Sequence, residues 1–349
     1  MQLSARTLDG PEDIGALFSD MVARGYTDGL PVVPPTEAAV RAMIEGSGLD
    51  AAQSIAAIPP RGGAATVEKI AINAVMAGCL PEHLPVVIAA VRAIAEPAFN
   101  LAAVQATTSA ATPVVIVNGP MRTRIGLNCG RGCLGPGVRA NATIGRAVRL
   151  VMLNIGGGVT GDVDKSIHGM PGKYTFCFGE LEEDSPWAPY HVERGYAAER
   201  STVTVIAGQS TQSVYAAFRT PESIVHALAD SMACYANGYL RGTGNPLVVL
   251  SPGHARIFAE HGWSKARLKE TLFERTKIPL SYLPEEKQLS NPVYTDWDRS
   301  RTIQLCEQPD DITVIVAGGP EAYQITYIAA FSGSRRITAP IEAHEETAS

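Results

Sequence analysis

A glycine-rich loop carries the two cysteines whose spacing is best suited to chemistry. Residues 128–137 read Asn-Cys-Gly-Arg-Gly-Cys-Leu-Gly-Pro-Gly, so Cys129 and Cys133 flank a Gly-Arg-Gly tripeptide. Glycine leaves the backbone free to bring the two sulfur atoms together. The thiolate is the nucleophilic form of cysteine, and a nearby positive charge or helix N-terminus lowers the thiol pKa. We therefore expect Cys129 or Cys133 to act as a nucleophile, or the two to form a redox pair.

The loop leads into an amphipathic helix that is predicted over residues 139–153. A helix N-terminus presents unpaired N–H groups and about half a positive charge, so it favours a carboxylate or phosphate. No Gly-Lys-Ser/Thr follows the loop, and it does not match Gly-x-Gly-x-x-Gly, so a nucleotide is not specifically indicated. The alternative is a surface helix with solvated arginines. We expect a small anionic substrate to bind here, through Asn128, Arg131, Arg139, Asn141, Thr143 and Arg146, with the arginines also lowering the thiol pKa.

Acid–base chemistry is an alternative to the thiol. His168 and His254 lie in glycine-rich turns, where a general base reaches a substrate, although each is also typical of an ordinary loop histidine. Glu180 follows the strand-like segment 174–178 and is the member of an acidic run best placed to point inward. Lys173 precedes the same segment and is a further catalytic candidate. The histidines show none of the close pairings that are typical of zinc sites, so we expect no metal and no cofactor.

Four apolar, β-branched segments each end in a glycine-containing turn, at residues 113–120, 202–208, 246–253 and 312–320. Apolar runs without alternation suit strands that are buried on both faces, and helical segments lie between them. The sequence therefore predicts an α/β fold with mostly parallel sheets and flanking helices. Ligand sites in such sheets form where the strands end. We expect the turns after Val117, Ile206, Leu250 and Val316 to line one crevice, which adds Asn118, Gly318 and Gly319 to the candidate binding residues.

Composition predicts the class of protein and its domain organisation. The chain has 349 residues, 46% apolar and 18% charged, which is typical of a soluble protein with a substantial core. We expect two α/β domains or lobes, at residues 1–200 and 201–349, because a long irregular segment ends just before residue 200. The N-terminal domain would hold the glycine and cysteine loop and the anion-binding helix. A homo-oligomer is plausible for a chain with so few charges.

Charge and hydropathy exclude several classes of partner. The net charge of -6 is spread without long single-sign blocks, so we expect no binding to nucleic acid. No apolar stretch approaches the roughly 20 residues of a membrane span, and no secretion signal is recognisable, so we expect a cytoplasmic protein without membrane contact. Six cysteines are too sparse for a disulfide framework. Four of them lie in apolar surroundings and are expected to be packed core thiols: Cys79, Cys177, Cys234 and Cys306.

Four longer motifs resemble a poorly characterised bacterial family over roughly residues 15–340. They are Asp28-Gly-Leu-Pro-Val-Val-Pro-Pro-Thr36, the segment 65–79, Gly135-Pro-Gly-Val-Arg-Ala-Asn-Ala-Thr-Ile-Gly-Arg146 and Pro171-Gly-Lys-Tyr-Thr-Phe-Cys-Phe178. Members of that family are often encoded beside, or fused to, small UGSC-type proteins, which are named for a selenocysteine or cysteine motif. The resemblance implies thiol or selenol chemistry on a small molecule and a small UGSC-type partner protein. This chain has no UGSC motif itself.

Three functions follow from these observations. The first is an enzyme that uses a cysteine thiolate to make or break a carbon–heteroatom bond in a small anionic metabolite, with sulfur transfer or reduction as variants. The second is a cofactor-independent hydratase or hydrolase that relies on histidine, glutamate and lysine. The third is a non-catalytic subunit that binds a substrate for a thiol- or selenol-bearing partner.

Overall fold

One mixed sheet forms the centre of the protein. The computed structural model describes residues 2–234, 243–282 and 300–342. The sheet has seven strands in the order β4-β3-β5-β10-β6-β9, and β11 pairs with β5. Its strands are β3 (Thr112–Asn118), β4 (Cys177–Gly179), β5 (Thr202–Tyr215), β6 (Leu247–Leu250), β9 (Thr313–Val316), β10 (Gln324–Ala330) and β11 (Ile337–Pro340). Two short antiparallel pairs lie apart from it, β1 (Ser54–Ile58) with β2 (Gly63–Thr66) and β7 (Lys277–Pro279) with β8 (Thr302–Gln304).

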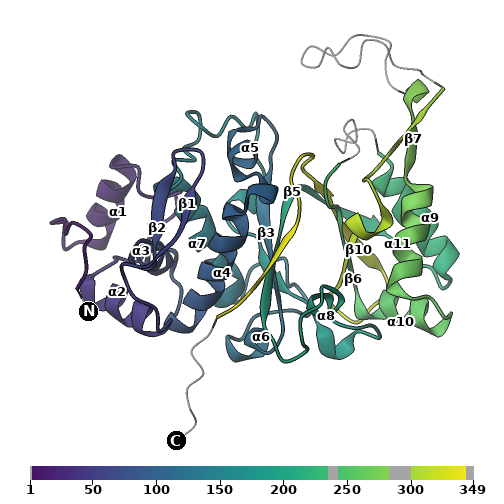
Figure 1. The fold of residues 1–349 in the computed structure, drawn as a ribbon, viewed down its shortest axis with the longest axis horizontal. Helices are drawn as coiled ribbons and strands as arrows, with labels where there is room; N and C mark the ends of the chain where they lie inside the picture. The colour runs from purple at the N-terminus through teal and green to yellow at the C-terminus, as the bar shows by residue number, and fades with distance from the viewer. Residues whose placement is uncertain (1, 235–242, 283–299, 343–349) are drawn as a thin grey trace, which may run out of the picture.

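Helices flank the sheet on two sides, which confirms the predicted α/β class. Figure 1 shows the earlier helices on one side of the strands and the later helices on the other. The first group comprises α1 (Ile14–Ala23), α2 (Glu37–Glu45), α3 (Val67–Ala77), α4 (Leu84–Ala95), α5 (Leu101–Ala106) and α7 (Arg139–Asn154). The second comprises α9 (Pro221–Met232), α10 (Pro252–Glu260) and α11 (Lys265–Arg275). Two short helices lie near the ends of strands, α6 (Met121–Arg124) and α8 (Tyr190–Glu193).

The prediction that the sheet is mostly parallel is wrong. Among the strands that the structure describes, only β3 with β4 and β6 with β9 pair in parallel. The pairs of β5 with β3, β10 and β11, and of β10 with β6, are antiparallel. The sequence signal was uniform hydrophobicity, which reports burial on both faces and carries no information about strand direction.

The curled sheet buries both of its faces. Alternate residues of a strand point to opposite faces, and here each face packs into a different apolar cluster. One face encloses a central cluster that includes Ile116, Phe178, Ile206, Leu247, Ile315 and Ile328. The other face packs on the first group of helices through residues such as Val115 and Val203, and on the second group through residues such as Val248 and Val314.

Local sequence chemistry accounts for where the helices begin and end. The hydroxyl of Thr66 accepts a hydrogen bond from the main chain of Lys69 and caps α3, while Gly78 ends that helix with a φ of 91°. Ser251 caps α10, and Pro252 occupies its first turn, where no N–H group is needed. These contacts fix the helices at the ends of the strands that they follow.

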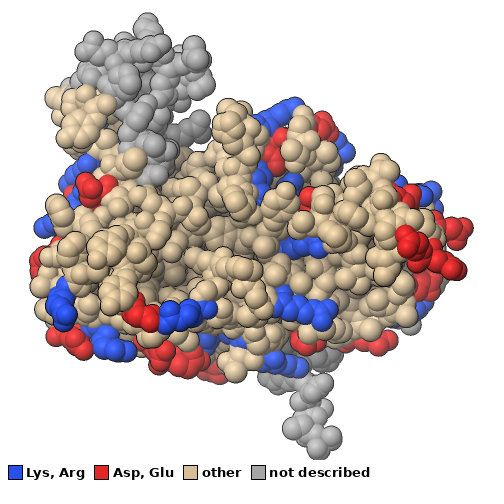
Figure 2. Space-filling model, turned by 180° about the vertical axis from the view of Figure 1, so that it is seen from behind, with Lys and Arg blue, Asp and Glu red and all other residues tan. Residues whose placement is uncertain are grey.

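Three further expectations concern the whole chain. The predicted domain boundary near residue 200 falls between α8 and β5 and stays a prediction, while one sheet contains strands from both sides of it. Acidic and basic side chains are interspersed over the face in Figure 2. Within the described residues, no single helix is long and apolar enough to cross a membrane, although the bent pair Pro81–Ala95 and Pro97–Ala106 together has a suitable length and composition.

Candidate functional site

The ends of β3, β4 and β9 meet at one edge of the central cluster. The Leu181 N–H, just beyond β4, donates to the Val316 carbonyl at 2.7 Å. The Gly318 N–H, just beyond β9, donates to the Cys129 carbonyl at 2.9 Å. The glycine and cysteine loop is thereby attached to the end of the sheet. Asn118, Cys129, Glu180 and Gly318, all predicted from the sequence, therefore lie in one region.

The turn after β6 joins the same region, whereas the turn predicted after Ile206 does not exist. The Ala317 N–H donates to the Leu250 carbonyl at 2.9 Å. At Ile206 the chain continues as β5 as far as Tyr215, so no crevice wall forms there. Gly319 lies beside the exposed ion pair of Arg131 and Glu321, where a side chain would crowd both groups.

Asn128 and Asn141 hold the loop together. The Asn128 N–H donates to the Asn141 side-chain oxygen at 2.8 Å, and the Asn141 amide donates to the carbonyls of Asn128 and Cys133. The Asn128 side chain also accepts from the Gly130 N–H at 2.9 Å. Both side-chain amides thus hold the loop in its conformation. This structural role explains the two asparagines without a bound ligand.

The arginines predicted to surround the start of α7 do not converge there. Each of these side chains, and Thr143, has another partner: Glu321 for Arg131, the Gly78 carbonyl for Arg139, Asp28 for Arg146 and the Arg139 carbonyl for Thr143. The first helical turn is therefore not the centre of an arginine cluster.

Three of the predicted acid–base residues lie away from the strand ends that meet. His254 is fully buried, with Ser251 Oγ at 2.8 Å and the Ala216 carbonyl at 3.0 Å from its ring nitrogens. Burial lowers the pKa of His254, so the ring is neutral at pH 7. His168 is exposed. Lys173 binds Asp164 at 2.7 Å and Ser166 at 2.6 Å, within its own loop.

A buried guanidinium occupies the space between the strand ends. Arg122 follows β3 on α6, and its side chain is 5% exposed. One of its terminal nitrogens donates to the Glu180 carbonyl at 2.6 Å and lies 3.8 Å from Cys129 Sγ. The other binds Glu182 at 2.9 Å and Glu183 at 3.0 Å. These residues, with Asn118 and His191, form what we call the Arg122 cluster.

Glu180 is the most deeply buried acid of the cluster, as its position after the strand-like segment predicted. Its carboxylate accepts from Asn118 Nδ2 at 2.6 Å and from the Tyr190 N–H at 2.7 Å. Oε1 has no hydrogen-bond partner among the described residues and lies 3.8 Å from Lys265 Nζ. Burial raises the pKa of Glu180, against the opposing effect of Lys265. A proton on this carboxyl is therefore stabilised by the fold.

Glu182 connects Asn118 to Arg122 and His191. Glu182 Oε1 accepts from Asn118 Nδ2 at 2.9 Å and from the Gly119 N–H at 2.7 Å, and lies 3.7 Å from His191 Nδ1. That histidine nitrogen is buried and has no hydrogen-bond partner among the described residues, and the same is true of Asn118 Oδ1. Buried polar atoms are seldom left unpaired, so such atoms concentrated in one cluster mark it as a candidate functional site.

The expectation of a lowered thiol pKa is wrong for both loop cysteines. Burial raises the pKa of Cys129, although Arg122 opposes the effect, and burial together with Cys129 raises the pKa of Cys133 to about 11. Of the cysteines predicted to be core thiols, Cys79, Cys177 and Cys306 are buried, but Cys234 is exposed. Cys234 lies two residues beyond the last turn of α9, past the part of the helix that packs on the sheet.

Sequence reasoning missed Arg122, His191 and Lys265, and it included Glu182 only as a member of the acidic run that contains Glu180. Arg122 was detectable in principle, because it is a charged residue two positions beyond the Gly-Pro turn that ends a buried strand. Lys265 comes from α11, and nothing in its neighbourhood in the sequence points to Glu180. In the described part of the chain, no group of three or more histidine, cysteine, aspartate or glutamate side chains is placed to hold a metal ion.

Comparison with known proteins assigns the chain to no family. No protein-family model matches the chain, and no curated protein has significant similarity to it. The resemblance to the UGSC-associated family therefore stays a prediction.

Alkylation tests the environment of the thiols. In native protein at pH 7, iodoacetamide is expected to label the exposed Cys234 well before Cys129 or Cys133, because burial hinders access and disfavours the thiolate. Mass spectrometry of peptides after timed labelling, with a denatured control, measures the three rates. Rapid native labelling of Cys133 at pH 7 would contradict the raised pKa.

The buried carboxyl of Glu180 predicts a dependence of stability on pH. A pKa that is higher in the folded than in the unfolded state stabilises the protein at low pH, and this contribution is lost as pH rises through the folded pKa. Relative to Glu180→Gln, which stays neutral, the wild-type free energy of unfolding should therefore fall as pH increases, by at most about 1.4 kcal/mol per pH unit. Urea denaturation of both proteins from pH 5 to 8 measures the two free energies of unfolding. A wild-type free energy of unfolding that rises with pH relative to that of Glu180→Gln would contradict the prediction.

Proposed function

We propose that the protein is an enzyme that acts on a small anionic metabolite at the Arg122 cluster, with Cys129 as the reacting thiol. The observation that carries the proposal is the contact of Arg122 with both the Cys129 sulfur and the carboxylate of Glu183. Glu183 is 62% exposed, whereas Glu182, the other acid on Arg122, is 12% exposed. Arg122 thus has one carboxylate that is fixed in the interior and one that faces solvent.

Glu183 marks where the anionic group of a substrate binds. Its hydrogen bond to Arg122 holds the pKa of the Glu183 carboxyl below its usual range, so this side chain is ionised at neutral pH. Glu183 is the exposed partner and Glu182 stays on Arg122, so a substrate carboxylate or phosphate can replace Glu183 without leaving the buried guanidinium unpaired. Arginine binds either anion through paired N–H donors. A substrate bound in this way lies against Cys129.

The chemistry follows from the groups around the sulfur. The Cys129 thiol is protonated in the free protein, so a reaction requires a base, and the displaced carboxylate of Glu183 can accept the proton. The sulfur then forms a bond to an electrophilic carbon of the substrate, a carbon–heteroatom bond breaks, and the proton passes to the leaving heteroatom. Arg122 stabilises the negative charge of the bound group.

A second candidate is a hydratase or hydrolase that uses Glu180 as its proton donor. Glu180 favours this function because its pKa is raised and its Oε1 has no hydrogen-bond partner among the described residues. Raised carboxyl pKa values are typical of general acids.

Three further proposals rest on composition and on the resemblance alone. They are a cytoplasmic location, assembly as a homo-oligomer and association with a small UGSC-type protein. All six cysteines are free thiols, which agrees with a reducing compartment.

Charged and neutral alkylating reagents test the anion site beside Cys129. If Arg122 binds anions, the ratio of iodoacetate to iodoacetamide labelling rates should be about fivefold higher at Cys129 than at the exposed Cys234, which corresponds to ~1 kcal/mol of attraction. Glu183→Gln frees Arg122 and should raise the ratio at Cys129 further. Peptide mapping gives both ratios in one sample. Equal ratios at the two cysteines, in wild type and in Glu183→Gln, would remove the basis of the proposal.

Turnover of a metabolite mixture separates the two candidates. Wild-type protein, Cys129→Ser and Glu180→Gln are each incubated with a deproteinised extract, and consumption of anionic compounds is followed by mass spectrometry. The thiol enzyme predicts loss of turnover by at least ~100-fold in Cys129→Ser, whereas the acid–base enzyme predicts that loss in Glu180→Gln and near-normal turnover in Cys129→Ser. Absence of turnover in all three supports the non-catalytic subunit.

A further inference from the structure

A second polar site lies apart from the Arg122 cluster. It is a pocket of about 360 Å³ whose walls come from four segments: the residues after α8, the segment before β6, the turn before β9 and the chain that leads into and includes the start of β11. Its charged residues are Arg194, Arg335, Arg336 and Asp311, and its neutral polar residues are Tyr196, Asn245 and Thr338. This volume is in the range of small-molecule sites. We call it the arginine pocket.

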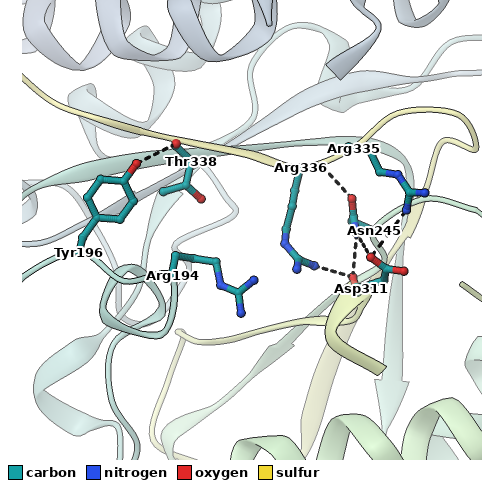
Figure 3. Close-up of a pocket in the computed structure, with 7 residues that line it drawn as sticks. All are labelled: Arg194, Tyr196, Asn245, Asp311, Arg335, Arg336 and Thr338. Carbon is teal, nitrogen blue, oxygen red and sulfur yellow. Dashed lines mark hydrogen bonds and ion pairs between the residues drawn. The ribbon is translucent and has the colours of Figure 1, made fainter. Parts of the chain in front are cut away.

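Asp310 holds two of the guanidinium groups together. Both terminal nitrogens of Arg194 bind its carboxylate, at 2.8 and 2.9 Å, and Arg336 binds the same carboxylate at 2.7 Å. Asp310 is not one of the residues that line the pocket. Figure 3 shows the two guanidinium groups near each other in the space between Thr338 and Asp311. Two cations that would repel each other are thereby kept side by side before any ligand arrives.

The remaining contacts fix the walls in the same way. The Asn245 side chain donates to Asp311 at 3.0 Å and accepts from the Arg336 N–H at 2.7 Å. The Tyr196 hydroxyl donates to the Thr338 carbonyl at 3.1 Å. Pre-organised walls reduce the entropy lost on binding.

The charge of the pocket favours an anion. Three arginines and one aspartate line it. The acids that pair with these arginines are Asp310, Asp311, Glu193 and Glu307, and the first of these also faces Lys269. Arg194 Nε is buried and has no hydrogen-bond partner among the described residues. Buried donors are seldom left unpaired, so this nitrogen marks the wall of the pocket as a candidate binding site.

We propose that the arginine pocket binds a small molecule through a carboxylate or phosphate group, which contacts Arg194 and Arg336. The paired guanidinium groups match the several acceptor oxygens of such a group, and a single ammonium group would not do so. The proposal does not depend on the function of the Arg122 cluster, because no residue is shared between the two sites.

Calorimetric titration with inorganic phosphate and with succinate tests the proposal on the full chain. At low ionic strength, at least one of the probes is expected to bind with saturation, and the stronger one identifies the anionic group. Arg336→Gln should weaken binding by roughly tenfold to a hundredfold, as expected for loss of a hydrogen bond from a charged donor. Arg335→Gln should weaken binding by about severalfold, because it removes one positive charge from the wall of the pocket. Arg61→Gln is the matched control, because Arg61 forms an exposed ion pair with Asp162 elsewhere on the surface.

The outcome is decisive even if one variant fails to fold. Arg335 is 40% exposed and Arg336 12%, so Arg335→Gln is expected to keep its circular dichroism spectrum and decides the test if Arg336→Gln unfolds. No saturable binding of either probe, or equal binding by wild type, Arg335→Gln and Arg61→Gln, overturns the proposal.

Discussion

Burial of both faces of the central sheet is the constraint on which the rest of the structure depends. One face encloses residues such as Phe178 and Ile328, and helices cover the other. A sheet with no open face offers polar chemistry only where its strands end, since unpaired main-chain and side-chain groups are too costly inside it. For this reason Asn118 is the last residue of β3 and Glu180 directly follows β4, and the Arg122 side chain lies in the same region.

Charge pairing determines what is possible at those strand ends. A buried arginine without acids would cost several kcal/mol, and Arg122 is therefore held by Glu182 and Glu183. From Glu180 the pairing continues through alternating charges to the arginine pocket, by way of Lys265, Glu193, Lys269 and Asp310. Buried ion pairs add little net stability compared with apolar residues of the same size. A binding or catalytic role accounts for such a concentration of them better than stability does.

The sequence predicted the strands around this site better than the long-range side-chain pairs that connect them. Uniform β-branched runs located β3, β5, β6 and β9, and the structure brings Asn118 and Gly318, from the ends of β3 and β9, into one region. Strand direction was not predictable, because antiparallel strands buried on both faces have the same composition as parallel ones. Arg146 forms an ion pair with Asp28, which is 118 positions away in the sequence, and no local sequence pattern predicts such a pair. The same holds for the arginine pocket, whose walls come from four separate segments of the chain.

The pairing of β11 with β5 determines when this edge of β5 becomes paired during synthesis. Residues 202–205 of β5 pair with β3 on one side and with β11 (Ile337–Pro340) on the other. Arg92 of α4 forms an ion pair with Glu342, just beyond β11. This edge of β5 therefore stays unpaired until β11 has left the ribosome. Until then one edge of β5 is open to pairing with other chains, which is the state in which nascent proteins aggregate or engage chaperones. This edge of β5 is thus completed by a strand that is translated long after β5 itself.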